Sequence, residues 1–331
     1  MKELIDERQK RMVQLLYKAE LKESEYIDIF KGVDMDSEDK YYLDAMAKIA
    51  SENKWFGVPK EICPRLMGMR KLRKVRFSAM IPEALKLFSL WNDKGYRWML
   101  FRDTALQMSN LSDEILDITR LSVKIDLNDS AMAIKCASQL GFVSQKIGNA
   151  RVLKKDCCEI ELAGDILNGD VFSFDSLFKR SETKTFHNVL VRIPSKEDMF
   201  LLQMKQAYDL YIVYFSNDKV FYWICKMIYL IKDIDWQKIE EIQFQCTDQI
   251  YFGVMASILS KTVEGVDVKT TEGINFLLKL QNERFDVKKE CERQQCIFLK
   301  GKKIKRSDNM ILKKINDMRR KLLRYCLHKE K

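Results

Sequence analysis

The chain has 331 residues, of which 47% are hydrophobic and 32% charged, with only 12 Gly and 4 Pro. This composition is typical of a folded protein with a sizeable core, and it excludes a disordered chain, a collagen-like fibre and a Gly-rich β-solenoid. The formal net charge is +10, and residues 299–331 account for all of it with 13 Lys and Arg against 3 Asp and Glu. The residues before them therefore carry 45 charges of each sign.

The sequence predicts a cytoplasmic protein without a transmembrane segment. The most apolar stretch, residues 220–231, is interrupted by Lys226 and is too short to cross a bilayer. The first residues are charged and lack the apolar core of a signal peptide. Nine cysteines, an odd number at irregular positions, favour reduced thiols over a disulfide framework or a zinc site.

The first ninety residues are predicted to be helical. Apolar residues recur at helical spacing near the N-terminus, and a second helix is expected over residues 37–53. Two prolines within residues 58–65 predict a break, and Pro82 is expected to begin a further helix toward Lys94. Between them, residues 65–76 hold six Lys and Arg without an acid, which we interpret as a solvated helix face.

The middle of the chain predicts a core of short, mixed strands. Strands are expected at residues 97–101, 121–127, 142–147, 151–154, 157–162 and 185–193, with helical residues at 105–108. A helix through Leu140 is expected between the second and third strands. Its N-cap candidates are Asn128, Asp129 and Ser130, and Gly141 is expected to end it.

The last third returns to helix. Ser195, with an acid three residues on, is the expected N-cap of a helix over residues 199–211. Further helices are predicted over residues 219–231, 236–246, 249–262, 273–282 and 308–327.

Several common enzyme signatures are absent from the sequence. It contains no G-x-G-x-x-G, no G-x-x-x-x-G-K-[ST] and no G-x-S-x-G motif. Dehydrogenases, P-loop NTPases and α/β serine hydrolases are therefore poor interpretations.

Acidic residues occur on two of the predicted strands. Side chains at i and i+2 of a strand share a face, so residues 124 and 126 point the same way, as do Glu159 and Glu161. Carboxylates presented together from neighbouring strands can hold Mg²⁺ against a triphosphate. The alternative is that these are ordinary polar residues at strand ends.

The order of motifs resembles the bacterial nucleotidyltransferase-like family of the polymerase-β superfamily, over roughly residues 80–245. The motifs are LFRD (100–103), RLSVKIDL (120–127), QLGF (139–142), IELA (160–163), IPSKEDMFLL (193–202) and IDWQKIEEI (234–242). The resemblance implies an α+β or α/β fold with a small mixed sheet between helical regions. Together with the helical patterns on either side and the charge of the tail, it divides the chain into a helical N-terminal region (1–80), a nucleotidyltransferase-like core (81–205), a helical C-terminal domain (206–298) and a basic amphipathic tail helix (299–331).

The resemblance also implies a site for Mg²⁺ and a nucleoside triphosphate. Asp126 and Glu161 fall on metal-binding and catalytic positions of the family. The residues placed against the nucleotide are Arg102, Asp103, Lys124 and Arg120.

Three departures from the family pattern affect this site. Asp103 stands where the family has Gly, Lys124 where it has the first metal-binding Asp, and Ala163 where it has His. A shift of two residues would pair Asp126 with Asn128, which is a weak Mg²⁺ ligand.

The resemblance, with its three departures, leaves two interpretations of the function. One is transfer of a nucleoside monophosphate from Mg-NTP to a hydroxyl acceptor. The other is a catalytically degenerate fold that acts as a nucleotide-, RNA- or protein-binding module.

The basic tail allows a third interpretation. Residues 300–306 and the predicted helix after Ser307 form a cationic amphipathic element that suits RNA, an acidic protein or a membrane surface. In the alternative that we favour, its stripe of Ile311, Ile315, Met318 and Leu322 packs on the body of the protein.

Overall fold

The computed structural model describes residues 7–17, 27–33, 40–109, 118–147, 150–163, 170–214, 221, 223–227, 230 and 234–244, all within the compact unit Met1–Phe285. The predicted helices at 249–262, 273–282 and 308–327, with the basic tail, lie outside these residues. Of the helix predicted at 219–231, the described residues 221, 223–227 and 230 are helical. Within them the fold is α+β. No helix among the described residues has both the length and the apolarity needed to cross a membrane.

Among the described residues of the N-terminal region lie three long helices, as the helical spacing of apolar residues predicted. They are α1 (Glu7–Tyr17), α3 (Lys40–Glu52) and α4 (Cys63–Asp93). Helices α1 and α3 bury their apolar faces, and α3 contacts both α1 and α4. Arg73 of α4 forms an ion pair with the fully buried carboxylate of Asp44 in α3, so the contact between these two helices is partly electrostatic.

Helix α4 corrects the prediction that a new helix begins at Pro82. Pro82 lies inside a single helix of 31 residues. Buried residues of α4 flank the proline on both sides, with Met80 and Ile81 before it and Ala84, Leu87, Phe88 and Trp91 after it. Burial of these side chains outweighs the backbone hydrogen bond that a proline removes from a helix interior.

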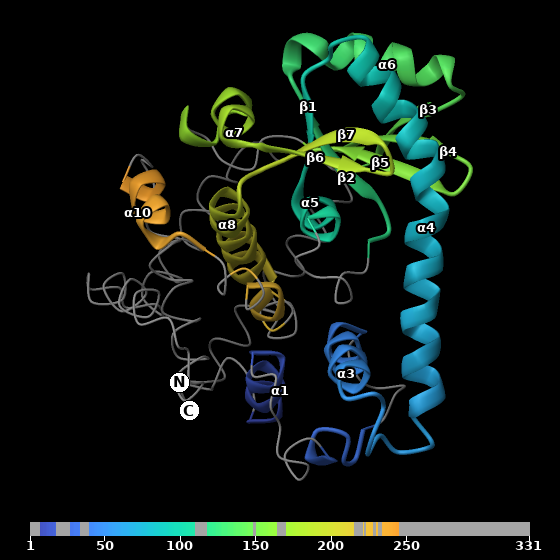
Figure 1. The fold of residues 1–331 in the computed structure, drawn as a ribbon, viewed down its shortest axis with the longest axis vertical. Helices are drawn as coiled ribbons and strands as arrows, with labels where there is room; N and C mark the ends of the chain where they lie inside the picture. Colours follow the sequence, from blue (N-terminus) through green and yellow to red (C-terminus); the bar gives the residue numbers. More distant parts are fainter. Residues whose placement is uncertain are drawn as a thin grey trace, which may run out of the picture. The chain divides into compact units, whose positions relative to one another are not determined.

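A five-stranded mixed sheet follows α4 (Figure 1). Its strands are β1 (Trp98–Leu100), β2 (Leu121–Ile125), β3 (Val143–Ile147), β4 (Ala150–Lys155) and β5 (Cys158–Leu162). Their spatial order is β1-β2-β5-β4-β3, in which only β2 and β5 pair in parallel. These five strands confirm the short mixed strands that the sequence predicted.

The two faces of the sheet differ in polarity. On one face, Val123, Leu153 and Ile160 are completely buried, and α4 covers this face. Phe88 and Trp91 of α4 contact Trp98 of β1. Helix α6 (Leu127–Gln139) joins the layer, since the Trp91 indole donates a hydrogen bond to the Ala133 carbonyl at 3.1 Å. The opposite face carries the polar side chains that the sequence singled out.

A two-stranded hairpin replaces the single strand predicted at residues 185–193. It consists of β6 (Glu182–Phe186) and β7 (Val189–Ile193). His187 and Asn188 between them have φ of 45° and 66°, and a two-residue type I′ hairpin turn requires positive φ at both of these positions. The prediction was wrong because this turn contains neither Gly nor Pro, the usual sequence signals of a turn.

Further helices follow or precede the strands. They are α5 (Arg102–Met108), a 3-10 turn (Asp170–Phe172), α7 (Phe174–Arg180), α8 (Lys196–Tyr214) and α10 (Trp236–Phe244). Among them, α8 contacts α5 and α10 contacts α8. The predicted cap of α8 is confirmed, because the Asp198 backbone N–H donates to Ser195 Oγ at 3.1 Å. Gly141 follows the end of α6 with φ of 85°, also as expected.

Candidate functional site

Arg102 occupies the junction between β1 and α5. The backbone N–H of the preceding residue, Phe101, donates to the Ser122 carbonyl of β2 at 2.8 Å. Arg102 then takes φ of 51°, in the left-handed region that favours glycine. The family pattern has its glycine one residue later, at Asp103, so the unusual conformation falls on the basic residue instead.

Glu161 lies on β5 and binds Arg102. Ser122 of β2 and Glu161 are register partners on adjacent parallel strands, and such partners share a face of the sheet. The Arg102 guanidinium donates to Glu161 Oε1 at 2.6 Å, and both side chains are largely buried. The carboxylate predicted to bind a metal is thus neutralised by a cation of the same chain.

Asp126 lies one residue beyond β2, where it is the N-cap of α6. Its Oδ1 accepts a hydrogen bond from the Asn128 backbone N–H at 3.0 Å. Its Oδ2 accepts one from Arg97 Nη1 at 2.7 Å. This corrects the expected caps at residues 128–130, since an Asp directly before the helix can reach the free N–H groups of the first turn.

Arg97 is itself held in place by α7. Its guanidinium lies over the rings of Phe174 and Phe178, at 5.3 and 4.8 Å from their centroids. It also pairs with Asp175 at 2.5 Å. The Arg97–Asp126 pair therefore connects the end of β2 to a separate helix.

Lys124 and Asp103 are the two residues that depart most from the family pattern. Lys124 is only 3% exposed, and its ammonium lies 5.4 Å from the centroid of the Phe101 ring. Asp103 in α5 accepts hydrogen bonds from Lys226 Nζ at 2.9 Å and from Gln203 Nε2 at 3.3 Å. Lys226 is also buried, so Asp103 serves as the counter-ion of a buried ammonium group.

Arg120 pairs with Glu159 on the same polar side of the sheet. Arg120 Nε and Lys154 Nζ each donate to one oxygen of the Glu159 carboxylate at 2.8 Å. The hydrogen bonds from Lys154 and Arg120 lower the pKa of Glu159 below its usual value. Arg120, which the resemblance placed against a nucleotide, instead has a carboxylate partner in the protein.

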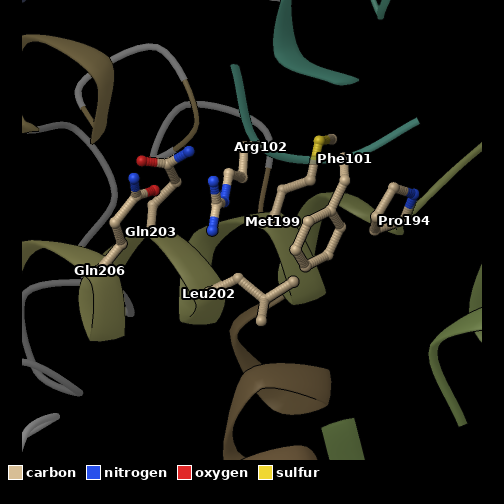
Figure 2. Close-up of a pocket in the computed structure, with 7 residues that line it drawn as sticks. All are labelled: Phe101, Arg102, Pro194, Met199, Leu202, Gln203 and Gln206. Carbon is tan, nitrogen blue, oxygen red and sulfur yellow. The ribbon is translucent and has the colours of Figure 1, made fainter. Parts of the chain in front are cut away.

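A small hollow lies beside Arg102, between α5 and α8. Figure 2 shows the polar ends of Arg102, Gln203 and Gln206 together, with apolar side chains opposite them. The apolar lining comes from Phe101, Pro194, Met199 and Leu202. Arg102 Nε and Gln203 Oε1 are buried without a hydrogen-bond partner among the described residues. The hollow has a volume of about 10 Å³, which suits one water molecule and leaves no room for a nucleotide.

The described residues do not fit a Mg²⁺ site. Asp126 uses both carboxylate oxygens within the protein, and Glu161 binds Arg102. Nowhere in the part of the chain that the structure describes do three His, Cys, Asp or Glu side chains gather as a metal site would need. A hard divalent cation requires several free oxygen ligands, and a guanidinium on each acid works against it.

Sequence reasoning did not find the cations that bind the candidate acids. Arg97 directly precedes β1 but belongs to no motif, and Lys226 lies 123 residues from Asp103. No local pattern links such pairs, because they are brought together by the packing of segments that are distant in the sequence. Arg102 and Arg120 were singled out in advance, but as nucleotide contacts rather than as the partners of Glu161 and Glu159.

Comparison with known proteins adds no relative. The chain matches no protein-family model, no curated protein and no solved structure. The likeness to the nucleotidyltransferase-like family therefore remains a resemblance carried by the motifs and their order.

Proposed function

We propose that this protein is a catalytically degenerate, nucleotidyltransferase-like protein that acts as a binding module for a protein or RNA. One observation carries the proposal: each candidate carboxylate is bound by a basic side chain of the same chain. The pairs are Asp126 with Arg97, Glu161 with Arg102, and Asp103 with Lys226.

Charge at the site supports a loss of catalysis. In-line nucleotidyl transfer needs a concentration of negative charge that attracts Mg²⁺ and, with it, the triphosphate. Here the acids are already paired, and a buried lysine, Lys124, stands where the resemblance expects the first metal ligand. The hollow beside Arg102 has room for about one water molecule, so it is not itself a nucleotide site.

Calorimetry with ATP, GTP, CTP and UTP, each in MgCl₂ and in EDTA, tests the loss of catalysis. We expect no Mg²⁺-dependent binding by the wild type and no transfer of label from α-labelled nucleotides to the protein or to RNA. Mg²⁺-dependent transfer by the wild type that Glu161→Gln abolishes would overturn the proposal.

A variant at Lys124 tests the reason for the loss. Lys124→Asp restores the acid that the family pattern expects, and we expect it to bind Mg²⁺ more tightly than the wild type. Lys124→Met is the matched control, because it removes the charge from this buried position without adding a ligand. Equal Mg²⁺ affinity in both variants would show that Lys124 is not what prevents metal binding.

An active enzyme is the second candidate. The parallel pairing of β2 with β5 favours it, because this brings the ends of the two acid-bearing segments side by side. Such an enzyme would transfer a nucleoside monophosphate from Mg-NTP to a hydroxyl group. It would first have to release Asp126 and Glu161 from Arg97 and Arg102, and the same transfer assay detects it.

A further inference from the structure

Helix α4 has different neighbours along its length. Its C-terminal half covers the sheet through Leu87, Phe88 and Trp91, which are completely buried. Its N-terminal half packs against α3, where Arg73 meets Asp44 (Figure 1). The side of this half that faces away from α3 is exposed.

An apolar strip lies on that exposed side. Gly68, Leu72 and Val75 follow each other at intervals of four and three residues, the spacing of positions that meet a second helix. Leu72 is 49% exposed and Val75 56% exposed. A Cβ placed on Gly68 would meet no atom within 4 Å, so packing within the described chain does not require a glycine there. A glycine at this position does allow another helix to approach closely.

Basic residues accompany the strip. Residues 64–82 contain no Asp or Glu, and Lys71 and Arg76 are exposed on the two sides of Leu72 and Val75. A solvated face explains the cations, but it leaves the exposed aliphatic side chains between them unexplained. An apolar seam with cations along its edges is complementary to a helix that has an apolar seam with acidic edges.

Other occupants fit this surface less well. A second copy would bring the same cations against each other if the two copies used this face. RNA binding favours aromatic or arginine stacking surfaces, whereas this strip is aliphatic. Helices that bind membrane surfaces usually present Trp, Phe or several Leu residues, and this strip offers one Leu and one Val beside Gly68.

We propose that this face of α4 is a docking surface for an acidic amphipathic helix of a partner protein. Apolar residues of the partner pack on Gly68, Leu72 and Val75, and its Glu or Asp residues pair with Lys71 and Arg76. The surface is built from α4 alone, so it stands whether or not the strand-end site is catalytic.

A designed peptide tests the surface on the full-length protein. The probe is a labelled peptide of three heptads with Leu at a and d and Glu at e and g, and its binding is measured by fluorescence anisotropy. We expect binding to the wild type and a loss of affinity of about tenfold or more in Lys71→Glu/Leu72→Asp, which removes an apolar contact and reverses a charge.

A matched variant on α6 controls for the overall positive charge. Met132 is 53% exposed and Lys135 is also exposed, so Met132→Asp/Lys135→Glu changes the net charge equally on another helix. We expect this variant to bind the probe within about twofold of the wild type. An equal loss of affinity in both variants would mean that peptide binding depends only on the net charge of the protein, which would overturn the proposal.

Exchanging the charges of the protein surface and the peptide distinguishes binding at this surface from general electrostatic attraction. The Lys71→Glu/Arg76→Glu variant should lose the Glu peptide and bind a peptide with Lys in place of Glu. Failure of the wild type to bind the Glu peptide would contradict the proposal. It would also be overturned if Lys71→Glu/Leu72→Asp reduced binding to a 20-nucleotide RNA or to phosphatidylserine vesicles while peptide binding stayed unchanged.

Discussion

At the scale of single residues, Asp126 has two structural roles that can be separated. It caps α6 through Oδ1 and pairs with Arg97 through Oδ2. An asparagine can still accept the capping hydrogen bond but cannot form the ion pair. Substitutions at this position therefore distinguish a structural carboxylate from one kept for catalysis.

We expect Asp126→Ala to lower the free energy of unfolding by about 1–2 kcal/mol, because both the cap and the partner of Arg97 are lost. Asp126→Asn should cost less, because the cap remains. Urea unfolding of the two variants measures the difference. Unchanged stability in Asp126→Ala would contradict the structural role.

The contribution of Glu159 to stability is expected to depend on pH. Hydrogen bonds from Lys154 and Arg120 lower its pKa in the folded protein, while the pKa in the unfolded chain is about 4.3. A carboxylate with a lowered pKa stabilises the fold above its unfolded pKa, and this contribution is lost as the pH falls through the folded pKa. The stability difference between wild type and Glu159→Gln should therefore be largest near neutral pH, should begin to shrink below about pH 4.3, and should vanish as the pH falls through the lowered folded pKa.

Urea unfolding at several pH values measures that difference. Glu182→Gln is a suitable control, because Glu182 is exposed on β6 and its ion pair with Lys184 is long, at 4.0 Å. A difference for Glu159→Gln that stays constant down to about pH 3 would show that the pair with Lys154 and Arg120 does not stabilise the fold.

At the scale of elements, the β6–β7 hairpin depends on its two-residue turn. Asn188 has φ of 66°, which Asn and Gly tolerate and β-branched residues do not. We expect Asn188→Gly to leave the stability unchanged or slightly raised, and Asn188→Val to lower the free energy of unfolding by about 1–2 kcal/mol. Thermal unfolding compares the two, and equal melting temperatures would contradict the turn geometry.

At the scale of the whole molecule, the basic tail is separable by sequence from a body with balanced charge. Truncation after Phe298 removes 13 Lys and Arg and 3 Asp and Glu, together with the stripe of Ile311, Ile315, Met318 and Leu322. Burying each such side chain contributes about 1.5–3 kcal/mol, so we expect the truncated protein to melt at a lower temperature. Differential scanning calorimetry measures this.

Binding to heparin distinguishes the alternative role of the tail. If the tail serves a polyanion, truncation should leave the melting temperature unchanged and abolish a heparin affinity that falls steeply with salt. That combination would show that the stripe does not pack on the body of the protein.

The sequence alone determined most of the elements and their order. The apolar run of β1, the strand pattern of β2, β4 and β5, and the glycine that ends α6 are local signals. Such signals depend only on neighbouring residues, so they can be interpreted without knowledge of the fold. The same signals placed the acids near the ends of two neighbouring strands. Where an element lacked its usual signal, as at the His187–Asn188 turn, the sequence prediction was wrong.

Only the tertiary structure decided what the charged residues contact. Lys226 reaches Asp103, Arg97 reaches Asp126, and Arg102 reaches Glu161 because sheet pairing and helix packing bring distant segments together. It also decided that α4 continues through Pro82, since the buried face that outweighs the proline is formed by contacts with other elements. Hydrophobic periodicity is a property of neighbouring residues, whereas the partner of a charge depends on the whole fold.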